Sequence, residues 1–99
     1  MKVVITDAAY ADLLQIGREI RKDAPVRAET FVADLFDRCR RLGTMPRAYP
    51  LLPNWEDRGV RRRVHAHYLI FYRIGVDAVE VLHVLHGAMD YERVLFPYE

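Results

Sequence analysis

Apolar positions in the first half of the chain follow two different periods. Lys2 to Thr6 is a short stretch rich in β-branched residues, which favours a strand. After it, apolar residues recur every three or four positions. This spacing predicts an amphipathic helix with Thr6 or Asp7 as its N-cap and an end near Asp23. The apolar stripe of this first helix consists of Leu13, Ile16, Gly17 and Ile20.

A second helical pattern follows almost at once. Pro25 suits the first turn of a helix, where a missing N–H costs nothing, and Gly43 is a natural stop. Arg38, Arg40 and Arg41 fall in the last turn, where they complement the partial negative charge of the helix end. Because few residues separate the two helices, they are expected to form an antiparallel hairpin. The second apolar stripe consists of Ala28, Phe31, Val32, Leu35, Phe36, Cys39 and Leu42.

Residues 44–59 contain three prolines, which argue against regular structure. We predict a loop that is long for so small a domain. Long loops often take part in function or bind a partner. The side chains that would pack it on the rest of the protein are Tyr49, Leu51, Leu52 and Trp55.

The second half of the chain shows the period of β-strands. Three strands are predicted, Val60 to His65, His67 to Ile74 and Ala78 to Leu85, and tight turns join them into an antiparallel meander. In the last two strands both alternating faces are apolar, so the sheet is expected to be covered on both sides. The helical hairpin can cover one face. The segment Met89 to Glu99, as a short helical turn or a strand-like tail, or else another protein, must cover the other.

The order of elements predicts an α+β fold with an N-terminal strand, an antiparallel helical hairpin and a three-stranded antiparallel meander in one twisted sheet. We expect the N-terminal strand to pair into that sheet, giving about four strands that are antiparallel throughout. A chain of 99 residues with 52% hydrophobic content can build one modest core, so residues 1–99 are expected to form a single domain.

Cysteine usage and hydropathy predict where the protein works. Cys39 is the single cysteine and falls on an apolar stripe, which indicates a reducing compartment and a core residue rather than a nucleophile. The N-terminal stretch MKVVITDAAY has too short an apolar run for a signal peptide, and no stretch approaches the roughly 18 apolar residues of a membrane span. We expect a cytoplasmic protein that does not contact a membrane.

Charge is unevenly distributed although the net charge is only +1. Residues 38–73 carry a local balance of +7, and the rest of the chain carries −6. Such asymmetry predicts a face that seeks an anionic partner, either nucleic acid or an acidic peptide. The alternative is that these arginines are solvated at a helix end and a strand rim. They are Arg38, Arg40, Arg41, Arg47, Arg58, Arg61, Arg62, Arg63 and Arg73.

Three motifs carry a resemblance to a known family. They are Gly-Val-Arg-Arg at residues 59–62, Ile-Phe-Tyr-Arg at residues 70–73 and the stretch from Val84 to Asp90. Their order and spacing, together with the predicted elements, resemble the ParE branch of the ParE/RelE superfamily, the toxins of bacterial type II toxin–antitoxin pairs. The resemblance extends over essentially the whole chain.

The resemblance implies partners and a target. A ParD-like antitoxin with a ribbon-helix-helix DNA-binding domain would neutralise the toxin in a hetero-oligomer, and operator DNA would be bound only through that antitoxin. ParE toxins are associated with inhibition of DNA gyrase and with plasmid stabilisation, whereas RelE toxins cut mRNA on the ribosome. An amphipathic antitoxin segment can cover apolar surface and place carboxylates near arginines. Its expected contacts are the sheet edge and four residues of the two helices, Leu13, Ile20, Phe31 and Leu35. The alternative is that these four residues are plain core.

The choice between gyrase inhibitor and ribonuclease depends on chemistry. RNA cleavage needs a base, an acid and a cation for the phosphorane charge, and Arg61, His86 and Tyr91 are candidates, with Arg63 and His83 as further possibilities. Lys2 and Lys22 are the only lysines and neither lies in the arginine-rich region, so the lysine-containing set of RelE-type enzymes is missing.

We therefore favour a gyrase inhibitor that binds its target without catalysis. The ribonuclease, and an inactive toxin kept as an antitoxin partner or co-repressor, remain as alternatives. Many members similar to this chain have Arg where it has Met89, which leaves an adaptable apolar contact in place of a phosphate ligand. No cofactor is expected, and no spacing suggests a metal site. The predicted target-binding residues are Arg61, Arg62, Arg63, His86, Met89, Tyr91 and Arg93.

Overall fold

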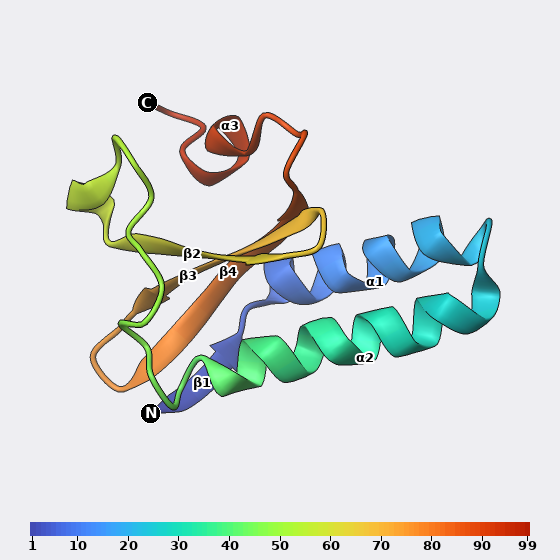
Figure 1. Ribbon diagram of the computed structural model, residues 1–99. Helices are drawn as coiled ribbons and strands as arrows, with labels where there is room; N and C mark the ends of the chain where they lie inside the picture. The colour runs from blue at the N-terminus through green and yellow to red at the C-terminus, as the bar shows by residue number, and fades with distance from the viewer.

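A four-stranded sheet carries a long helical hairpin on one face and a short C-terminal helix on the other (Figure 1). The computed structural model describes residues 1–99. The predicted α+β order of elements is confirmed. The elements are β1 (Lys2–Ile5), α1 (Asp7–Arg21), α2 (Pro25–Arg41), the 3-10 turn η1 (Glu56–Arg58), β2 (Val60–His65), β3 (Tyr68–Ile74), β4 (Ala78–His86) and α3 (Tyr91–Leu95).

The strand order is β1-β4-β3-β2, and the last three strands form the predicted antiparallel meander. The expectation of an entirely antiparallel sheet is wrong, because β1 pairs parallel with β4. The physical reason is the long connection between them, since parallel neighbours need a crossover of this kind and a tight hairpin cannot join them. Between the pairs Phe71–His83 and Tyr72–Val81 the register shifts, so Leu82 forms a bulge on β4.

The helical hairpin begins and closes through local contacts. Thr6 is the N-cap of α1, and its hydroxyl oxygen accepts a hydrogen bond from the N–H of Ala9 at 3.2 Å. A Cβ on Gly17 would lie 3.2 Å from a methyl group of Val32, so this glycine permits a close approach of α1 and α2. Gly43 follows α2 and packs against the backbone of Met1, whose amino group donates to the carbonyl of Gly43 at 2.6 Å.

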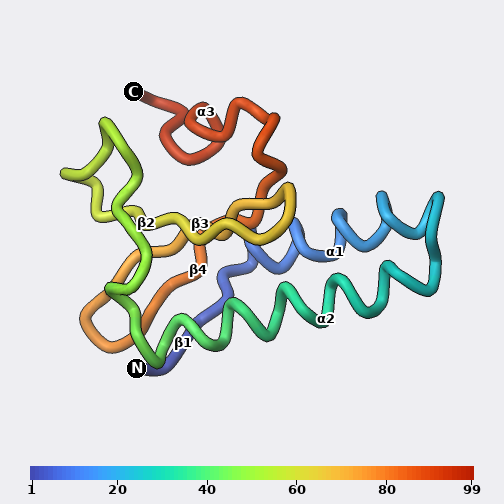
Figure 2. Tube along the Cα trace, in the orientation of Figure 1, coloured from blue at the N-terminus to red at the C-terminus, as the bar shows by residue number.

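Two apolar clusters occupy the two faces of the sheet. The larger lies on what we call the first face, between the sheet and the hairpin, and includes the fully buried Leu13, Leu35 and Tyr72. The smaller lies on the second face, where Phe71 and Leu85 pack beneath the C-terminal segment. The trace folds back over this face after β4 (Figure 2). The chain itself therefore covers much of the second face.

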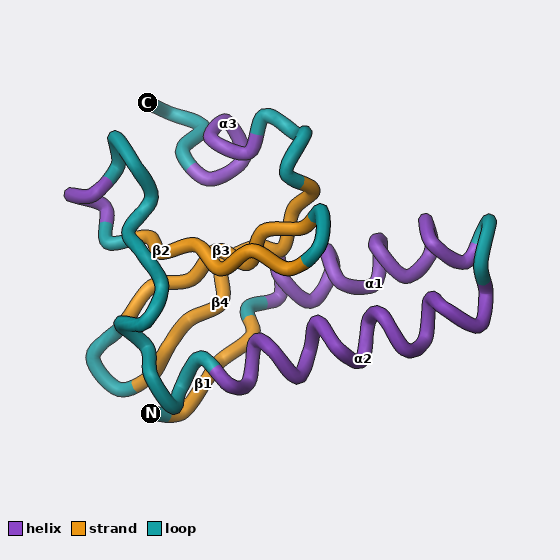
Figure 3. Tube along the Cα trace, viewed as in Figure 1, coloured by secondary structure: helices purple, strands orange, loops and turns teal.

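The connection between α2 and β2 is more ordered than its prolines predict (Figure 3). Leu51 forms a bridge with Arg61 on the outer edge of β2, and the N–H of Arg62 donates to the carbonyl of Pro50 at 3.1 Å. Trp55 stacks on Phe96 with ring centroids 4.1 Å apart. The loop therefore shields part of the β2 edge and holds the C-terminal segment in place.

No helix in the structure combines the length and the apolar character that crossing a membrane would require.

Candidate functional site

The three consecutive arginines of β2 point to opposite faces of the sheet, as alternation along a strand requires. Arg61 and Arg63 face the hairpin side. A guanidinium nitrogen of Arg61 donates to the carbonyl of Tyr49 at 2.8 Å. Arg63 donates to the carbonyl of Arg38 at 3.2 Å, and its guanidinium lies 4.9 Å from the centroid of the Tyr49 ring.

These contacts give Arg61 and Arg63 a structural role. The carbonyl of Arg38 belongs to the last turn of α2, where carbonyl groups have no partner within the helix. Arg63 supplies that partner and a positive charge at the negative end of the helix dipole. Arg61 fastens the loop that precedes β2. Both were predicted to contact a target, which stays a prediction, and each binds a backbone carbonyl group of its own chain.

Arg62 lies on the second face and meets Tyr91 of α3. Its guanidinium donates to the Tyr91 hydroxyl at 3.3 Å, and the Tyr91 ring centroid lies 5.1 Å from that of Phe71. The predicted ribonuclease set paired Tyr91 with Arg61, but Arg61 is directed to the other face of the sheet. Arg62 is therefore the arginine that the fold brings to the C-terminal tyrosine.

His86 ends β4 and is exposed. Its Nδ1 accepts a hydrogen bond from the N–H of Ala88 at 3.0 Å, so the neutral ring carries its proton on Nε2. The ring makes an edge contact with Tyr68, its cross-strand partner, at 5.3 Å and stacks near His67 at 5.9 Å. His67 and Tyr68 were not among the predicted site residues, although pairing between the last two strands places them beside His86.

Two adjoining cavities lie where the hairpin passes the end of β4, and Tyr68 and His86 line both. Their volumes are about 380 and 210 Å³. We call them together the hairpin groove. Its walls combine apolar, aromatic and charged side chains, and they include four residues that the sequence singled out from two different predicted surfaces, namely Ile20, Phe31, His86 and Met89.

Leu13 and Leu35 do not present a surface for an antitoxin. Both have no exposed area and belong to the cluster between hairpin and sheet. Their helical stripes face the sheet, which explains why the alternative interpretation, plain core, applies to them. Ile20 and Phe31 lie at the margin of the same cluster and remain partly exposed. Of the four predicted contacts, these two are accessible to a partner.

Asp12 of α1 holds His83 of β4. Its carboxylate oxygen lies 2.8 Å from Nδ1 of His83 and accepts the N–H of Val84 at 2.9 Å. Because β1 ends at Ile5, this part of the β4 edge has no neighbouring strand, and Asp12 satisfies the exposed N–H. The sequence did not single out Asp12, since it is a polar residue on a helix whose partner lies 71 positions away.

Two buried groups have shifted pKa values. Burial raises the pKa of the Cys39 thiol to about 11, although the positive charges of Arg63 and Arg40 partly oppose this. The thiol is therefore neutral at physiological pH, which is consistent with the predicted core role. Burial also raises the pKa of Tyr72, whose hydroxyl donates to the carbonyl of Pro46 at 2.6 Å. No group of three or more His, Cys, Asp or Glu side chains is placed to hold a metal ion.

The fold is that of a small α+β protein with a helical hairpin on one face of a four-stranded sheet. A family model described as the ParE toxin of the type II toxin–antitoxin system parDE matches residues 3–91. The chain therefore belongs to the ParE toxin family.

Two solved structures show the same fold. A chain from the chromosomal ParDE system of P. aeruginosa has a TM-score of 0.75 at 21% identity, over 87% of this chain and 95% of that one. A chain from the RelBE2 toxin–antitoxin complex of Mycobacterium tuberculosis has a TM-score of 0.62 at 24% identity, over 86% and 95% of the two chains. No curated protein matches the sequence.

Proposed function

We propose that this ParE family toxin inhibits DNA gyrase by binding it, without catalysis. The observation that carries the proposal is the surface around α3. There the Arg62 guanidinium and the Tyr91 hydroxyl form one polar unit, and the side chain of Arg93 is 86% exposed. Val94, which is 38% exposed, adds an apolar contact. Two arginines beside aromatic and apolar side chains suit a target that combines protein and DNA phosphates.

The second part of the proposal concerns neutralisation. A ParD-like antitoxin would occupy the hairpin groove and contact Ile20 and Phe31. The same groove is lined by His86 and Met89, so an antitoxin bound there would cover these two predicted target contacts. One of the two structural neighbours is a toxin–antitoxin complex, and the other is from a toxin–antitoxin system, which supports an antitoxin partner. Neutralisation would then follow from direct occlusion.

Further features of the proposal come from the family resemblance. The antitoxin would carry a ribbon-helix-helix domain, form a hetero-oligomer with the toxin and be the only part that binds operator DNA. The pair would act in the cytoplasm, and a plasmid that carried it would be stabilised.

A ribosome-dependent ribonuclease is the second candidate, and the structural similarity to a RelBE chain is compatible with it. His86 would donate a proton from Nε2, since its Nδ1 is engaged by Ala88. Arg62, and not Arg61, would stand beside Tyr91 as the phosphate ligand. An inactive toxin retained as an antitoxin partner or co-repressor is the third candidate.

The test is gyrase-dependent supercoiling of plasmid DNA, with purified protein alone and with the product of the neighbouring gene. We expect inhibition that the neighbour's product reverses. Arg62→Ala should raise the half-inhibitory concentration about tenfold, equivalent to about 1.4 kcal/mol. Arg18→Ala is the matched control, because the Arg18 guanidinium binds only Gln15 on the surface of α1. A folded sample that leaves supercoiling intact but cleaves mRNA on ribosomes would replace this proposal with the ribonuclease.

A further inference from the structure

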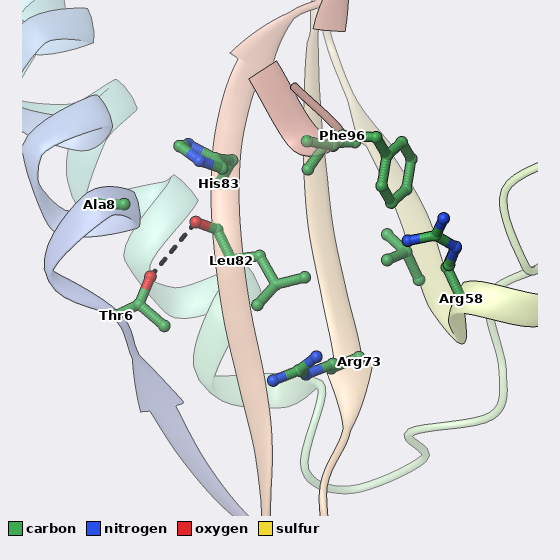
Figure 4. Close-up of a pocket in the computed structure, with 9 residues that line it drawn as sticks. Thr6, Ala8, Arg58, Arg73, Leu82, His83 and Phe96 are labelled. Atoms are coloured by element: carbon green, nitrogen blue, oxygen red, sulfur yellow. Dashed lines mark hydrogen bonds between the residues drawn. The ribbon is translucent and has the colours of Figure 1, made fainter. Parts of the chain in front are cut away.

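A third cavity lies on the second face of the sheet, on the other side of β4 from the hairpin groove. Its volume is about 450 Å³, within the range of sites that hold a small ligand or a few peptide side chains. We call it the arginine cavity. Figure 4 shows Arg58 and Phe96 on one side, Thr6 and His83 on the other, and Leu82 between them. The full lining is Thr6, Ala8, Arg58, Val60, Arg73, Leu82, His83, Leu95 and Phe96.

The floor of the arginine cavity is largely apolar and includes the bulge on β4. Val60 and Arg73 are cross-strand partners on β2 and β3, and Leu82 is the bulged residue of β4. Leu95 and Phe96 close the floor from the C-terminal segment. The helix α3 covers the part of the second face around Phe71 and Leu85. The floor of the arginine cavity is the part of this face that the chain leaves partly open.

The charged side chains that line the arginine cavity are two arginines, and an imidazole ring lies beside them. Arg58, Arg73 and His83 line it, and no acidic side chain does. Each arginine already binds a carboxylate of its own chain. Arg73 pairs with Glu80 at 2.8 Å, and Arg58 pairs with Glu99 near the end of the chain and, at 3.8 Å, with Asp57. These pairs are solvent-accessible, so a carboxylate from outside can replace them at little cost in free energy.

The wall formed by His83 is fixed in position. Asp12 holds its Nδ1 at 2.8 Å from the hairpin side. Thr6 is also fully engaged, because its hydroxyl donates to the carbonyls of Val81 and Leu82 at 2.7 and 3.2 Å. Neither residue needs to move when a ligand enters, so the two arginines are the adaptable groups of the cavity.

We infer that the arginine cavity binds an acidic peptide segment of a partner protein. A bulky apolar side chain of that segment lies over Val60 and Leu82, and its carboxylates bind Arg58 and Arg73. The chain contains its own precedent, since the Glu99 carboxylate in the C-terminal tail binds Arg58 beside the Phe96 ring. Charge complementarity carries this assignment. It holds whether or not gyrase is the target of the toxin.

Trp55 provides a built-in reporter for the test. It is the single tryptophan of the chain, it stacks on Phe96 at 4.1 Å, and the guanidinium of Arg58 lies 5.9 Å from its ring centroid. The probe is the blocked tetrapeptide acetyl-Glu-Leu-Leu-Glu-amide, and the neutral peptide acetyl-Gln-Leu-Leu-Gln-amide is its control. We expect a saturable change in fluorescence with the acidic peptide and at least about fivefold weaker binding of the neutral one.

Matched variants separate the cavity from general electrostatic attraction. Arg73→Gln should weaken binding about fivefold, whereas Arg18→Gln, which removes the same charge from an exposed position on α1, should leave it unchanged. Glu80→Gln should tighten binding about twofold, because it releases Arg73 from its internal partner. Circular dichroism checks that each variant is folded.

Several results would overturn the inference. They are the absence of saturable binding at millimolar peptide, equal binding of the neutral peptide, and an affinity that does not change with Arg73→Gln in folded protein. Tighter binding of a short DNA duplex that depends on Arg73 would make the site a nucleic-acid contact and would also overturn it.

Discussion

Leu35 and Phe31 lie one turn apart on α2, and substitution by alanine should affect them in different ways. Leu35 has no exposed area and packs in the cluster between hairpin and sheet. Leu35→Ala leaves a cavity in a close-packed core and should lower the free energy of unfolding by about 3 kcal/mol, within the usual 2–5 kcal/mol for this change. For a domain of this size, that loss corresponds to a fall in Tm of roughly 15 °C.

Phe31 is only partly buried. Its ring lies 5.6 Å from both His65 and Tyr68 and 5.5 Å from the guanidinium of Arg27, at the wall of the hairpin groove. Phe31→Ala should therefore cost less stability, about 1–2 kcal/mol. If an antitoxin occupies the groove, the same change removes an aromatic anchor. Binding should weaken by about 2 kcal/mol or more, which is about 30-fold.

Thermal denaturation gives the first quantity, and calorimetric titration with the neighbouring gene's product gives the second, at a temperature where both variants are folded. Val26→Ala is the matched control, because this α2 side chain is 82% exposed and belongs to neither the core clusters nor the groove. The reasoning is refuted if folded Phe31→Ala binds the antitoxin like the unchanged protein. It is also refuted if Leu35→Ala weakens binding as much as Phe31→Ala does.

Three further outcomes are expected. Tyr72→Phe removes the hydroxyl that donates to the carbonyl of Pro46 and should cost about 1–3 kcal/mol in urea denaturation; a change near zero would show that the carbonyl finds another donor. Burial raises the pKa of Cys39 to about 11, so on raising the pH the thiol loses its proton in the unfolded chain before it does so in the folded protein. Its contribution to the free energy of unfolding is therefore full below pH 9 and is lost as the pH rises towards 11. Unfolding measured from pH 8 to 11 should show a shallower decline for Cys39→Ala, and parallel curves would contradict this. Tyr91→Phe leaves Arg62 without its hydroxyl partner and should impair gyrase inhibition while Tm falls by only a few degrees; an equal loss of inhibition and of fold would give Tyr91 a structural role alone.

Much of the secondary structure follows from local physical chemistry. The N-cap at Thr6, the start of α2 at Pro25 and the limits of β2 at Val60 and His65 all lie where the sequence predicts them. Each depends on contacts within a few residues: a side-chain acceptor for free N–H groups, a missing N–H, or apolar alternation. Such interactions are encoded in short stretches and do not depend on how the chain closes.

Long-range pairing decides the rest. Whether β1 runs parallel to β4 depends on contacts between residues more than 70 positions apart, and the register shift at Leu82 depends on how β4 pairs with β3. The same holds for the arginines of β2. A run of positive charge predicts an anionic partner, but the fold delivers the carbonyl of Arg38 to Arg63 from 25 positions away and the hydroxyl of Tyr91 to Arg62 from 29 positions away.

The candidate site shows the same division. The helical periodicity and the family resemblance were enough to select Ile20, Phe31, His86 and Met89 as residues of interest, because both are visible in the sequence. Only the tertiary structure brings them to one groove and buries Leu13 and Leu35, which have the same helical periodicity. Periodicity determines which side chains share a face of a helix. Which part of that face lies beneath the sheet, and which projects past its end into solvent, is set by the packing of the hairpin against β4.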